Sequence, residues 1–539
     1  MRAQVKRNKV IPRRSPDLML ATVLSAAVHG LDGIPVSVEV DLQRGLRCVH
    51  IVGLPSPAVR ESRERVVAAL LNAGFTIPER RITVNLAPAD FPKEGAAFDL
   101  ALALGILKAS GQSSPDGLSG CCVLGELALD GSLRPVRGVL PIAIALRRQG
   151  VRRILVPRAN ALEAGLVPDL EVLACQSLTE AARSPAAVDD SFRLELHSAP
   201  RGKSGAPQPE DADATDVEHD LAQVRGQDVA KRALAVAAAG GHHALLIGPP
   251  GVGKSMLARC LPGMLPPLSA DEELDVRRIL SVCGRPEEAA AAHVRRPFRA
   301  PHHTLSVPAL VGGGRPVVPG EITRAHHGVL FLDEAPEFSR RLVDLLRQPL
   351  EEGSIRLARA NLEIAFPARF QLLAAMNPCP CGNLGSARKP CRCSPADVQR
   401  YRSRISGPVL DRIDIQLHLA SPPVDRLDTN EDALRHSETH RVRARIAAAR
   451  SRQTRRYAAA IDVYCNAQAK PQMRDTLLRA RQEALQLLRR AVRQWDLSMR
   501  AYERTLRVAR TVADLDGASD VDAQHVAEAL RYRIPHRRN

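Results

Sequence analysis

Short apolar runs alternate with amphipathic stretches along most of the chain, and this pattern begins near Met19. Segments 36–42 and 81–88 show the period-two alternation typical of strands, whereas 57–75 has the three-to-four spacing of an amphipathic helix. The apolar segment 96–107 predicts a second helix. Helices and strands that alternate in this way predict a layered α+β or α/β domain in the N-terminal part.

The central part of the chain predicts buried parallel strands instead. Segments 242–248, 328–334 and 370–377 are each a short apolar run that ends where glycine or polar side chains begin. Strands buried on both faces read as continuous apolar runs of this kind, so a parallel sheet is expected. The last part of the chain has helical spacing throughout.

These patterns divide the 539 residues into five segments, and the expected fold class is α/β. The segment before the central α/β core lacks large apolar groups and is rich in Pro, Gly, Ala and acids, which predicts a linker. The predicted segments are a basic, disordered extension (1–18), an α+β domain (19–190), the linker (191–219), an α/β core (220–425) and a helical domain (426–539).

The charge and the composition of the chain indicate which classes of molecule it can bind. Lys and Arg number 76 and Asp and Glu 59, so the net charge is +17, which suits a polyanion such as DNA but also arises from arginines spread over solvated faces. Aromatic residues are only 3%, so DNA contacts should be mainly to phosphates. No apolar stretch is long enough to span a membrane, and scattered cysteines favour a reducing, cytoplasmic location.

One sequence motif predicts a phosphate-binding loop. Residues 248–255 fit the pattern GxxxxGK[ST] between a predicted strand and a predicted helix. Glycines let the backbone N–H groups curl around phosphates, Lys254 reaches the β- and γ-phosphates, and the Ser255 hydroxyl serves Mg²⁺. The predicted ATP-binding residues are Gly248, Pro249, Pro250, Gly251, Val252, Gly253, Lys254 and Ser255.

Two further strands should end beside this loop. Asp333 and Glu334 follow one of them, at the end of a parallel sheet where ligands bind. Asp333 is expected to orient Mg²⁺ and Glu334 to polarise the attacking water, although an acidic helix cap after a strand would look the same. Asn377 follows the third strand and can hold the same water or the γ-phosphate.

These three strand ends together resemble AAA+ ATPases, with Asn377 in the sensor 1 position. The long motifs 298–334, 338–360 and 367–382 are similar to the magnesium-chelatase-like ComM/YifB family, over nearly the whole chain from residue 19. The resemblance implies ATP and Mg²⁺ as cofactors, a hexameric ring and a DNA branch-migration role in recombination of transforming DNA. Magnesium-chelatase relatives leave a second function open, protein remodelling or metal insertion.

The resemblance also implies further ATP-site residues. Arg412 matches the arginine finger of related rings, which enters the neighbouring subunit's site, and Arg402 and Arg404 are rival candidates. Arg500 matches the sensor 2 position at the start of a lid helix, although an arginine on a solvated helix face fits the same pattern.

Three arginines are candidates for DNA contact. Arg356 and Arg359 lie on a predicted hairpin whose counterpart in related helicases carries a basic residue into the channel, but magnesium chelatases have a similar pattern. Arg315 lies in a glycine-rich loop. Segment 441–456 holds seven arginines and no acid, and both DNA contact and an exposed lid helix are consistent with it.

In the N-terminal domain, segments 92–98 (PKEGAAF) and 125–131 (GELALDG), followed by Leu140-Pro141, resemble the Lon protease domain, which has the ribosomal S5 domain 2-like fold. On that pattern Ala97 stands where the nucleophilic serine would be and Leu140 where its partner lysine would be. Neither side chain can act as nucleophile or base, so peptidase activity is not expected.

Four cysteines cluster after Asn377. Cys379, Cys381, Cys391 and Cys393 form two CxC pairs, which can close a tetrahedral Zn²⁺ site, and free thiols or a redox pair are the alternatives. Paired histidines such as His326 and His327 are interpreted as structural, because neighbours on a strand point to opposite faces.

Overall fold

The computed structural model describes residues 20–112, 119–183, 219–359, 362–385, 389–420, 438–460, 463–473 and 479–533. The chain forms two compact units. The first is Met1–Pro200 with Ser281–Ala290, and the second is Arg201–Leu280 with Ala291–Asn539. The predicted extension 1–18 lies outside the described residues, as does the predicted linker 191–219 except for its last residue.

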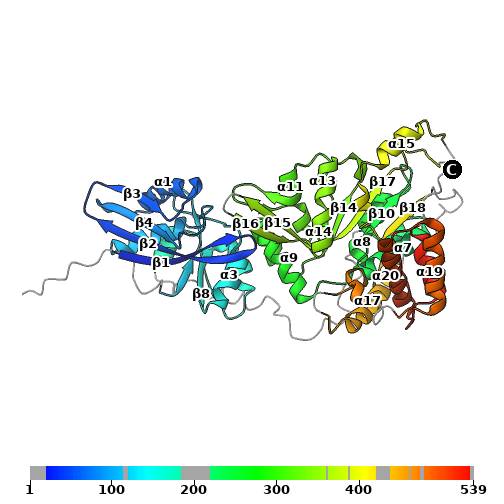
Figure 1. The fold of residues 1–539 in the computed structure, drawn as a ribbon. Coiled ribbons are helices and arrows are strands. Elements are labelled where there is room, and N and C mark those ends of the chain that lie inside the picture. Colours follow the sequence, from blue (N-terminus) through cyan, green and yellow to red (C-terminus); the bar gives the residue numbers. More distant parts are fainter. Residues whose placement is uncertain are drawn as a thin grey trace, which may run out of the picture. The chain divides into compact units, whose positions relative to one another are not determined.

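The first unit is built on a mixed seven-stranded sheet with the order β3-β4-β2-β1-β5-β8-β9 (Figure 1). The β1–β2 and β2–β4 pairs are antiparallel and the other pairs are parallel. The strands are β1 (Leu20–His29), β2 (Asp32–Gln43), β3 (Cys48–Val52), β4 (Arg81–Ala87), β5 (Cys121–Val123), β8 (Arg153–Pro157) and β9 (Glu171–Cys175), beside a small pair β6 (Glu126–Leu127) and β7 (Leu133–Arg134).

Helices cover this sheet. Helix α1 begins after Ser56, whose hydroxyl accepts from the Val59 N–H, and Pro57 suits the first turn because it needs no N–H donor there. Helix α2 is apolar on nearly all sides because it packs on β1, β2, α1 and α5. The helices are α1 (Pro57–Asn72), α2 (Asp99–Ala109), α3 (Val139–Arg148), α4 (Ala161–Gly165), α5 (Leu178–Ala182) and the short 3-10 turn η2 (Arg158–Asn160).

A segment from the middle of the chain completes the first unit. Ser281 accepts at its carbonyl from the Gly138 N–H at 3.0 Å and at its hydroxyl from the Leu140 N–H at 3.2 Å. Helix α10 (Pro286–Ala290) packs on α4 and η2. The sequence places these residues inside the core 220–425, whereas they fold with the N-terminal unit.

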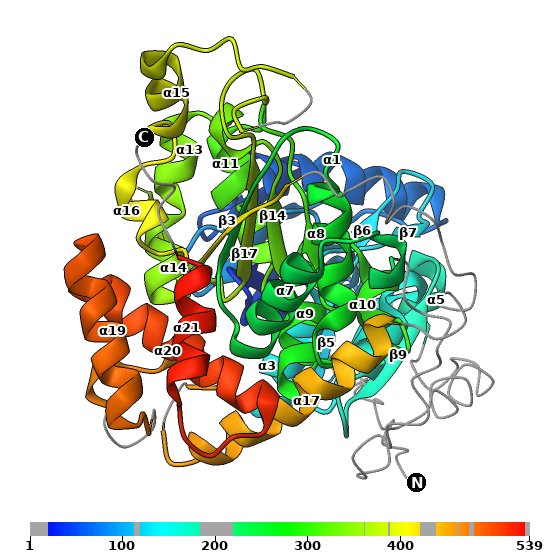
Figure 2. The ribbon, with the colours of Figure 1, turned by 90° about the vertical axis from the view of Figure 1, so that its right-hand side faces the viewer.

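The second unit is built on a five-stranded sheet in which every pair is parallel (Figure 2). The order is β11-β14-β17-β10-β18, so β17 lies between the strand before the phosphate loop and the strand before Asp333. The strands are β10 (Ala244–Ile247), β11 (Phe298–Arg299), β14 (Val329–Leu332), β17 (Gln371–Met376) and β18 (Ile415–His418).

Helices and two hairpins surround the parallel sheet. The hairpins are β12 (Gly312–Gly313) with β13 (Val318–Pro319) and β15 (Ser354–Arg359) with β16 (Leu362–Pro367). The helices are α7 (Asp228–Gly240), α8 (Lys254–Met264), α9 (Ala270–Val282), α11 (Val307–Val311), α12 (Glu321–Arg324), α13 (Arg340–Leu345), α14 (Arg347–Glu352), α15 (Pro395–Arg402) and α16 (Gly407–Leu410), and the 3-10 turns are η4 (Leu221–Gln223) and η5 (Ala335–Glu337).

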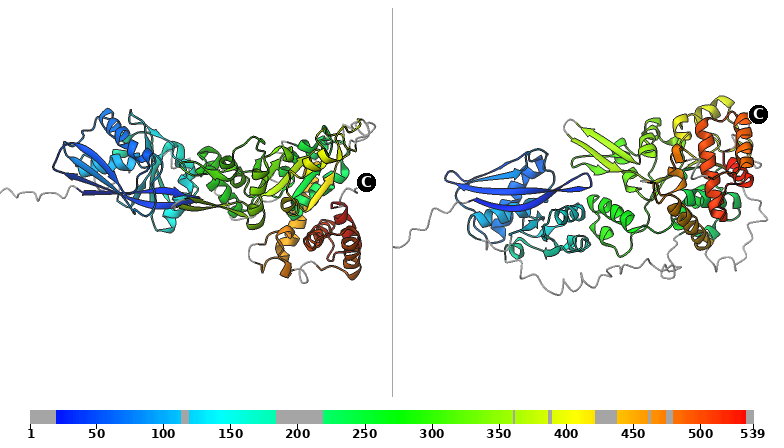
Figure 3. Two further views of the ribbon diagram at one scale, coloured as in Figure 1. Left: turned by 45° about the horizontal axis from the view of Figure 1, so that its top comes forward. Right: turned by 60° about the horizontal axis from the view of Figure 1, so that its bottom comes forward.

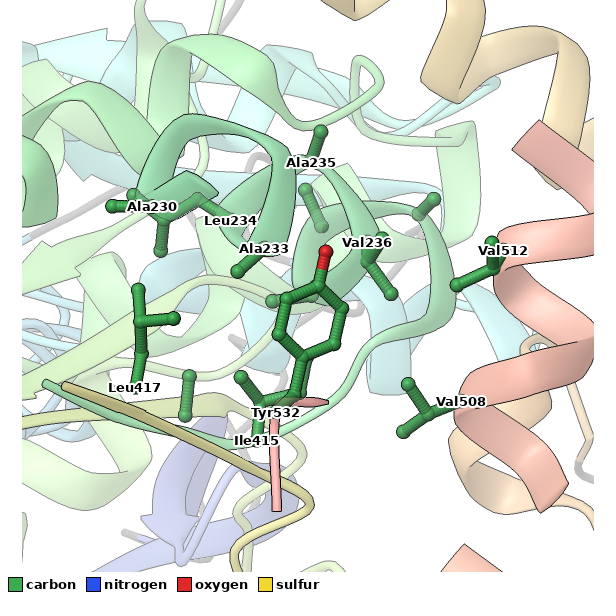
Figure 4. Close-up of a cluster of buried hydrophobic side chains, with 14 of the residues drawn as sticks. Ala230, Ala233, Leu234, Ala235, Val236, Ile415, Leu417, Val508, Val512 and Tyr532 are labelled. Carbon is green, nitrogen blue, oxygen red and sulfur yellow. The ribbon is translucent and has the colours of Figure 1, made fainter. Parts of the chain in front are cut away.

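The C-terminal helices gather beside the sheet of the same unit (Figure 3). They are α17 (Glu438–Arg456), α19 (Gln482–Trp495), α20 (Met499–Asp516) and α21 (Ala523–Arg531), with the 3-10 turns η8 (Asn466–Gln468) and η9 (Pro471–Met473). One apolar cluster joins them to the core, because Val236 of α7, Ile415 of β18, Val512 of α20 and Tyr532 pack together (Figure 4). The helices therefore share their hydrophobic core with the sheet.

The arginines of α17 bond mostly to the protein itself. Arg443 donates to the carbonyl of Gly263 in the last turn of α8 at 2.7 Å, and Arg450 donates to that of Ala238 in α7 at 3.0 Å. Arg452 donates to the Asp514 carbonyl of α20 at 2.8 Å. Carbonyls at helix ends lack partners within the helix, so α17 caps three other helices. Within the described residues, no helix is both long and apolar enough to cross a membrane.

Candidate functional site

The phosphate loop joins β10 to α8, as its sequence predicts. Gly251 and Gly253 have φ angles of 79° and 88°, a region that side chains with a Cβ rarely adopt. A Cβ at Gly248 would lie 2.9 Å from the Cβ and the carbonyl oxygen of Leu419. The glycines of the motif are therefore required by the backbone path and by close packing.

Lys254 links the loop to the third strand end. Its ammonium donates to the carbonyls of Gly248 and Pro249 at 2.7 and 3.0 Å and to Oδ1 of Asn377 at 2.9 Å. These three bonds use all three N–H groups of the ammonium. Burial lowers the pKa of Lys254, and the charges of Asp333 and Glu334 oppose this shift.

Ser255 links the loop to the second strand end. Its hydroxyl donates to Oδ2 of Asp333 at 2.7 Å, and Oδ1 of Asp333 accepts from the Glu334 N–H at 3.0 Å. Glu334 is exposed and has a φ of 49°, which is rare for a residue with a side chain. The chain thus turns sharply after β14 and leaves the Glu334 carboxylate accessible.

The strand order explains why these groups meet. Parallel strands present their carboxyl ends at one edge, and Ile247, Met376 and their neighbours pair in register. The Gly248 N–H also donates to the Met376 carbonyl at 3.1 Å. Three strand ends thus bring an ammonium, a hydroxyl, two carboxylates and an amide together, a set that suits a triphosphate with a divalent cation.

Comparison with known proteins agrees with this arrangement. Family models match three parts of the chain: magnesium chelatase, subunit ChlI, at residues 220–427; subunit ChlI of Mg-chelatase at 38–160; and the ChlI C-terminal model at 436–533. YifB of Escherichia coli K12 is 41% identical over 516 residues, which cover 96% of this chain and 97% of that protein. Competence protein ComM of Haemophilus influenzae is 43% identical over 516 residues, covering 96% and 98%.

The chain belongs to the magnesium-chelatase-like ComM/YifB family. The resemblance found in the sequence is thereby confirmed, and the central region is an AAA+-like α/β domain with a parallel sheet. A magnesium-chelatase 38 kDa subunit of Cereibacter sphaeroides is also similar, with 32% identity over 174 residues, 28% of this chain and 51% of that protein.

Four arginines that the ComM/YifB resemblance singles out lie in different settings. Arg402 donates to the Pro378 carbonyl at 3.3 Å, and Arg404 pairs with Glu337 at 3.1 Å, so both contact loops that follow strands of the same chain. Arg412 is 9% exposed, and its guanidinium pairs with Glu351. Arg500 is exposed in the first turn of α20, which Ser498 caps.

The predicted DNA-contact arginines lie on the two hairpins. Arg315 is exposed in the turn between β12 and β13, and Arg356 is exposed on β15. The two hairpins are neighbours, because a Cβ on Gly312 would lie 3.3 Å from the Leu357 side chain. Arg359 ends β15, and its side chain lies outside the described residues.

The four clustered cysteines converge as their spacing allows. The Cys379 sulfur lies 3.4 Å from that of Cys381 and 3.6 Å from that of Cys391, and the Cys381–Cys391 separation is 3.6 Å. All four Sγ atoms, that of Cys393 included, lie within 4.8 Å of one another. None of the eleven cysteines forms a disulfide bond. Backbone N–H groups of Arg392 and Asn383 lower the pKa of the Cys381 thiol to about 6.

A second cluster, Asp275 with His326 and His327, differs from the cysteines. His327 has a φ of 56°, so the two histidines are not strand neighbours on opposite faces, and their ring centroids lie 3.8 Å apart. The Arg369 N–H donates to Nδ1 of His326 at 3.0 Å, which leaves the ring proton on Nε2, the atom that faces Asp275. That nitrogen carries the ring proton and lies 3.8 Å from the Asp275 carboxylate, so it is not a free metal ligand.

Proposed function

We propose that this chain is an ATP hydrolase that drives movement along branched or duplex DNA, a ComM-like branch-migration motor in homologous recombination. The observation that carries the ATPase part is the convergence of Lys254, Ser255, Asp333 and Asn377 at one sheet edge. Hydrogen bonds of 2.9 and 2.7 Å already join these residues into one site. Nucleotide would replace them with bonds to phosphate and Mg²⁺.

Each residue has a distinct role in this proposal. Lys254 binds the β- and γ-phosphates, and Ser255 and Asp333 hold Mg²⁺, which neutralises phosphate charge when it is bound. The exposed carboxylate of Glu334 accepts a proton from the attacking water, and Asn377 orients that water. Attack in line with the leaving oxygen then breaks the bond between the β- and γ-phosphates.

The site is completed by a neighbouring subunit of a hexameric ring. Arg412 is the proposed finger from that neighbour, because Arg402 and Arg404 bond to the nucleotide loops of their own subunit. Arg412 must leave Glu351 to act in this way. The C-terminal helices form the lid, and Arg500 at the start of α20 is its proposed sensor 2 residue.

DNA is the proposed track of this motor. The net charge of +17 favours a polyanion, and Arg315 and Arg356 are exposed on two adjacent hairpins. Arg359 is placed with them on the sequence pattern alone. The H. influenzae relative is named a competence protein, which accords with DNA as partner.

The second candidate function is a chelatase-like or MoxR-like protein-remodelling or metal-insertion ATPase. The match of the central region to the magnesium chelatase subunit favours it. Both functions share the ATP site, so only the response to DNA separates them. Peptidase activity is part of neither, because Ala97 and Leu140 both pack in an apolar cluster where a serine and a lysine would be needed.

Structural Zn²⁺ at Cys379, Cys381, Cys391 and Cys393 is part of the same proposal. Thiolates are the ligands that Zn²⁺ prefers in structural sites, and the four sulfurs lie close enough to share one ion. Such a closed site takes no part in ATP hydrolysis, which uses Mg²⁺ at the strand ends.

The decisive experiment measures ATP hydrolysis and migration of a synthetic four-way junction by the purified full chain. Wild type is expected to do both, Lys254→Ala neither, and Glu334→Gln to bind ATP while hydrolysing it about a hundredfold more slowly. Glu352→Gln, an exposed carboxylate on α14, is the matched control and should behave as wild type. If DNA does not change the rate of ATP hydrolysis and the four-way junction does not migrate, the remodelling function is favoured.

A further inference from the structure

The cysteine cluster has the dimensions of a tetrahedral thiolate site. Zinc–sulfur bonds of about 2.3 Å put the sulfurs of such a site about 3.8 Å apart. The separations of Cys379, Cys381 and Cys391 are 3.4–3.6 Å, so an ion fits after a shift of a few tenths of an ångström. The sulfurs come from two short turns, which is how structural zinc sites are usually closed.

Backbone donors point at each sulfur. The Leu384 N–H donates to Cys379 at 3.3 Å, and those of Asn383 and Arg392 donate to Cys381. Cys391 accepts from the backbone of Cys393, and Cys393 from the backbone of Cys381. N–H donors directed at sulfur stabilise thiolates, and an outer shell of this kind is a general feature of metal sites.

The cluster also touches the nucleotide site. Gly382, between the two cysteine pairs, packs on the phosphate loop so closely that a Cβ there would lie 2.7 Å from Cδ and 2.9 Å from Cγ of Pro250. The same Cβ would lie 3.9 Å from Cγ of Asn377. Gly382 is itself held by its cluster, because its N–H donates to the Cys379 carbonyl at 3.0 Å.

From this contact we infer that Zn²⁺ bound by the four cysteines braces the phosphate loop, so that metal occupancy sets the affinity of the site for nucleotide. This inference rests on the proposed ATP site. The described residues of the cysteine-bearing segment, 379–385 and 389–393, form no helix or strand, so contacts between side chains must hold them in place. Metal binding joins those side chains, and its loss frees Gly382 to leave Pro250 and Asn377.

The first experiment measures zinc and nucleotide binding separately on the full chain. Wild type is expected to carry one Zn²⁺ per chain by elemental analysis without added nucleotide. Cys391→Ser with Cys393→Ser should lose the zinc and bind a fluorescent ATP analogue about tenfold more weakly. Cys48→Ser, which removes a half-buried thiol of β3 in the other unit, is the control and should change neither.

The second experiment breaks the contact without touching a ligand. Gly382→Ala should retain its zinc but bind nucleotide about tenfold more weakly, because the added Cβ pushes Pro250 away. Gly385→Ala is a matched control, since its φ of 77° equals that of Gly382 within a degree, while a Cβ there meets nothing within 4 Å. The backbone strain is thus the same in both variants, and only the contact differs.

The outcomes separate this inference from the proposed function. Purified wild type without zinc would overturn the metal site, and zinc-free variants with unchanged nucleotide affinity would overturn the brace. Equal effects of Gly382→Ala and Gly385→Ala would also overturn it. If zinc-loaded wild type binds no ATP analogue, the proposed ATPase fails, whereas the measured zinc still decides the metal site.

Discussion

Arg443 of α17 donates through Nε to the Gly263 carbonyl at 2.7 Å, and Gly263 lies in the last turn of the helix that starts with Lys254. Helix α17 therefore caps the C-terminal end of α8, the helix that follows the phosphate loop. This charge-assisted hydrogen bond ties α17 to the helix that follows the phosphate loop.

This bond predicts the effect of Arg443→Ala. Removing the guanidinium leaves the carbonyl without this partner, which should lower the free energy of unfolding by about 1–3 kcal/mol. Urea denaturation followed by circular dichroism measures the change. Arg441→Ala removes an exposed arginine of the same helix and should alter stability by less than about 0.5 kcal/mol. Equal losses in the two variants would contradict a capping role for Arg443.

Ser255→Ala tests the cation half of the site. The hydroxyl that bonds Asp333 at 2.7 Å is lost, so Mg²⁺ should no longer strengthen nucleotide binding and ATP hydrolysis should fall at least about tenfold. Titration of nucleotide with and without Mg²⁺ measures this. Ser255→Thr keeps a hydroxyl and should restore both properties. A Thr variant as impaired as the Ala variant would place the defect elsewhere.

Asn377→Ala tests whether the amide that follows β17 acts in ATP hydrolysis. Lys254 keeps its bonds to Gly248 and Pro249, so the loop should still bind nucleotide with little change. The amide that orients water is absent, and kcat for ATP hydrolysis should drop at least about tenfold while KM stays within about threefold. Steady-state kinetics separate the two parameters. A raised KM with an unchanged kcat would assign Asn377 to binding alone.

The burial of His326 leads us to expect that the free energy of unfolding depends on pH. Burial lowers the pKa of His326 to about 4, although the nearby Asp275 carboxylate opposes this shift. Unfolded histidine has a pKa of about 6.5, so between these values only the unfolded chain takes up the proton. The neutral ring therefore contributes stability that is full above about pH 6.5 and is lost as the pH falls toward about 4.

The measurement is urea denaturation at about pH 7 and about pH 5. His326→Gln removes the titrating ring but can still accept from the Arg369 N–H and donate to Asp275, so its stability should change less between the two pH values, by up to about 2 kcal/mol. His293→Gln, at an exposed position, should keep the wild-type dependence. An unchanged slope in His326→Gln would show that other groups cause the acid loss.

The convergence of the three strand ends could be predicted from the sequence because its determinants are local. Each of its parts is a strand followed at once by the chemistry, and parallel strands bring their ends to one edge. The placement of Lys254 beside Asn377, and of Ser255 beside Asp333, agrees with that prediction. The roles of these residues in hydrolysis remain predictions for the variants above.

Other features depend on packing that periodicity does not reveal. The sequence pattern does not reveal strand β1, because its second half is buried on both faces and shows no clean alternation. The arginine run of α17 is consistent with DNA contact or solvent exposure on its sequence alone, whereas in the structure Arg443, Arg450 and Arg452 donate to carbonyls at the ends of other helices. Charge alone cannot show this, because the helix ends that need partners are remote in sequence.

The segment Ser281–Ala290 bears on how the protein can be divided. Its partners Gly138 and Leu140 belong to the N-terminal unit, although the chain on either side of it belongs to the second. A fragment that starts after the linker would contain this segment without the N-terminal unit on which it packs. Ser281 would lose its hydrogen bonds to Gly138 and Leu140, and the buried Ala289 would become exposed to solvent. The borders of the two folded units therefore do not coincide with borders along the sequence, so a fragment cut after the linker would include a segment that packs in the first unit.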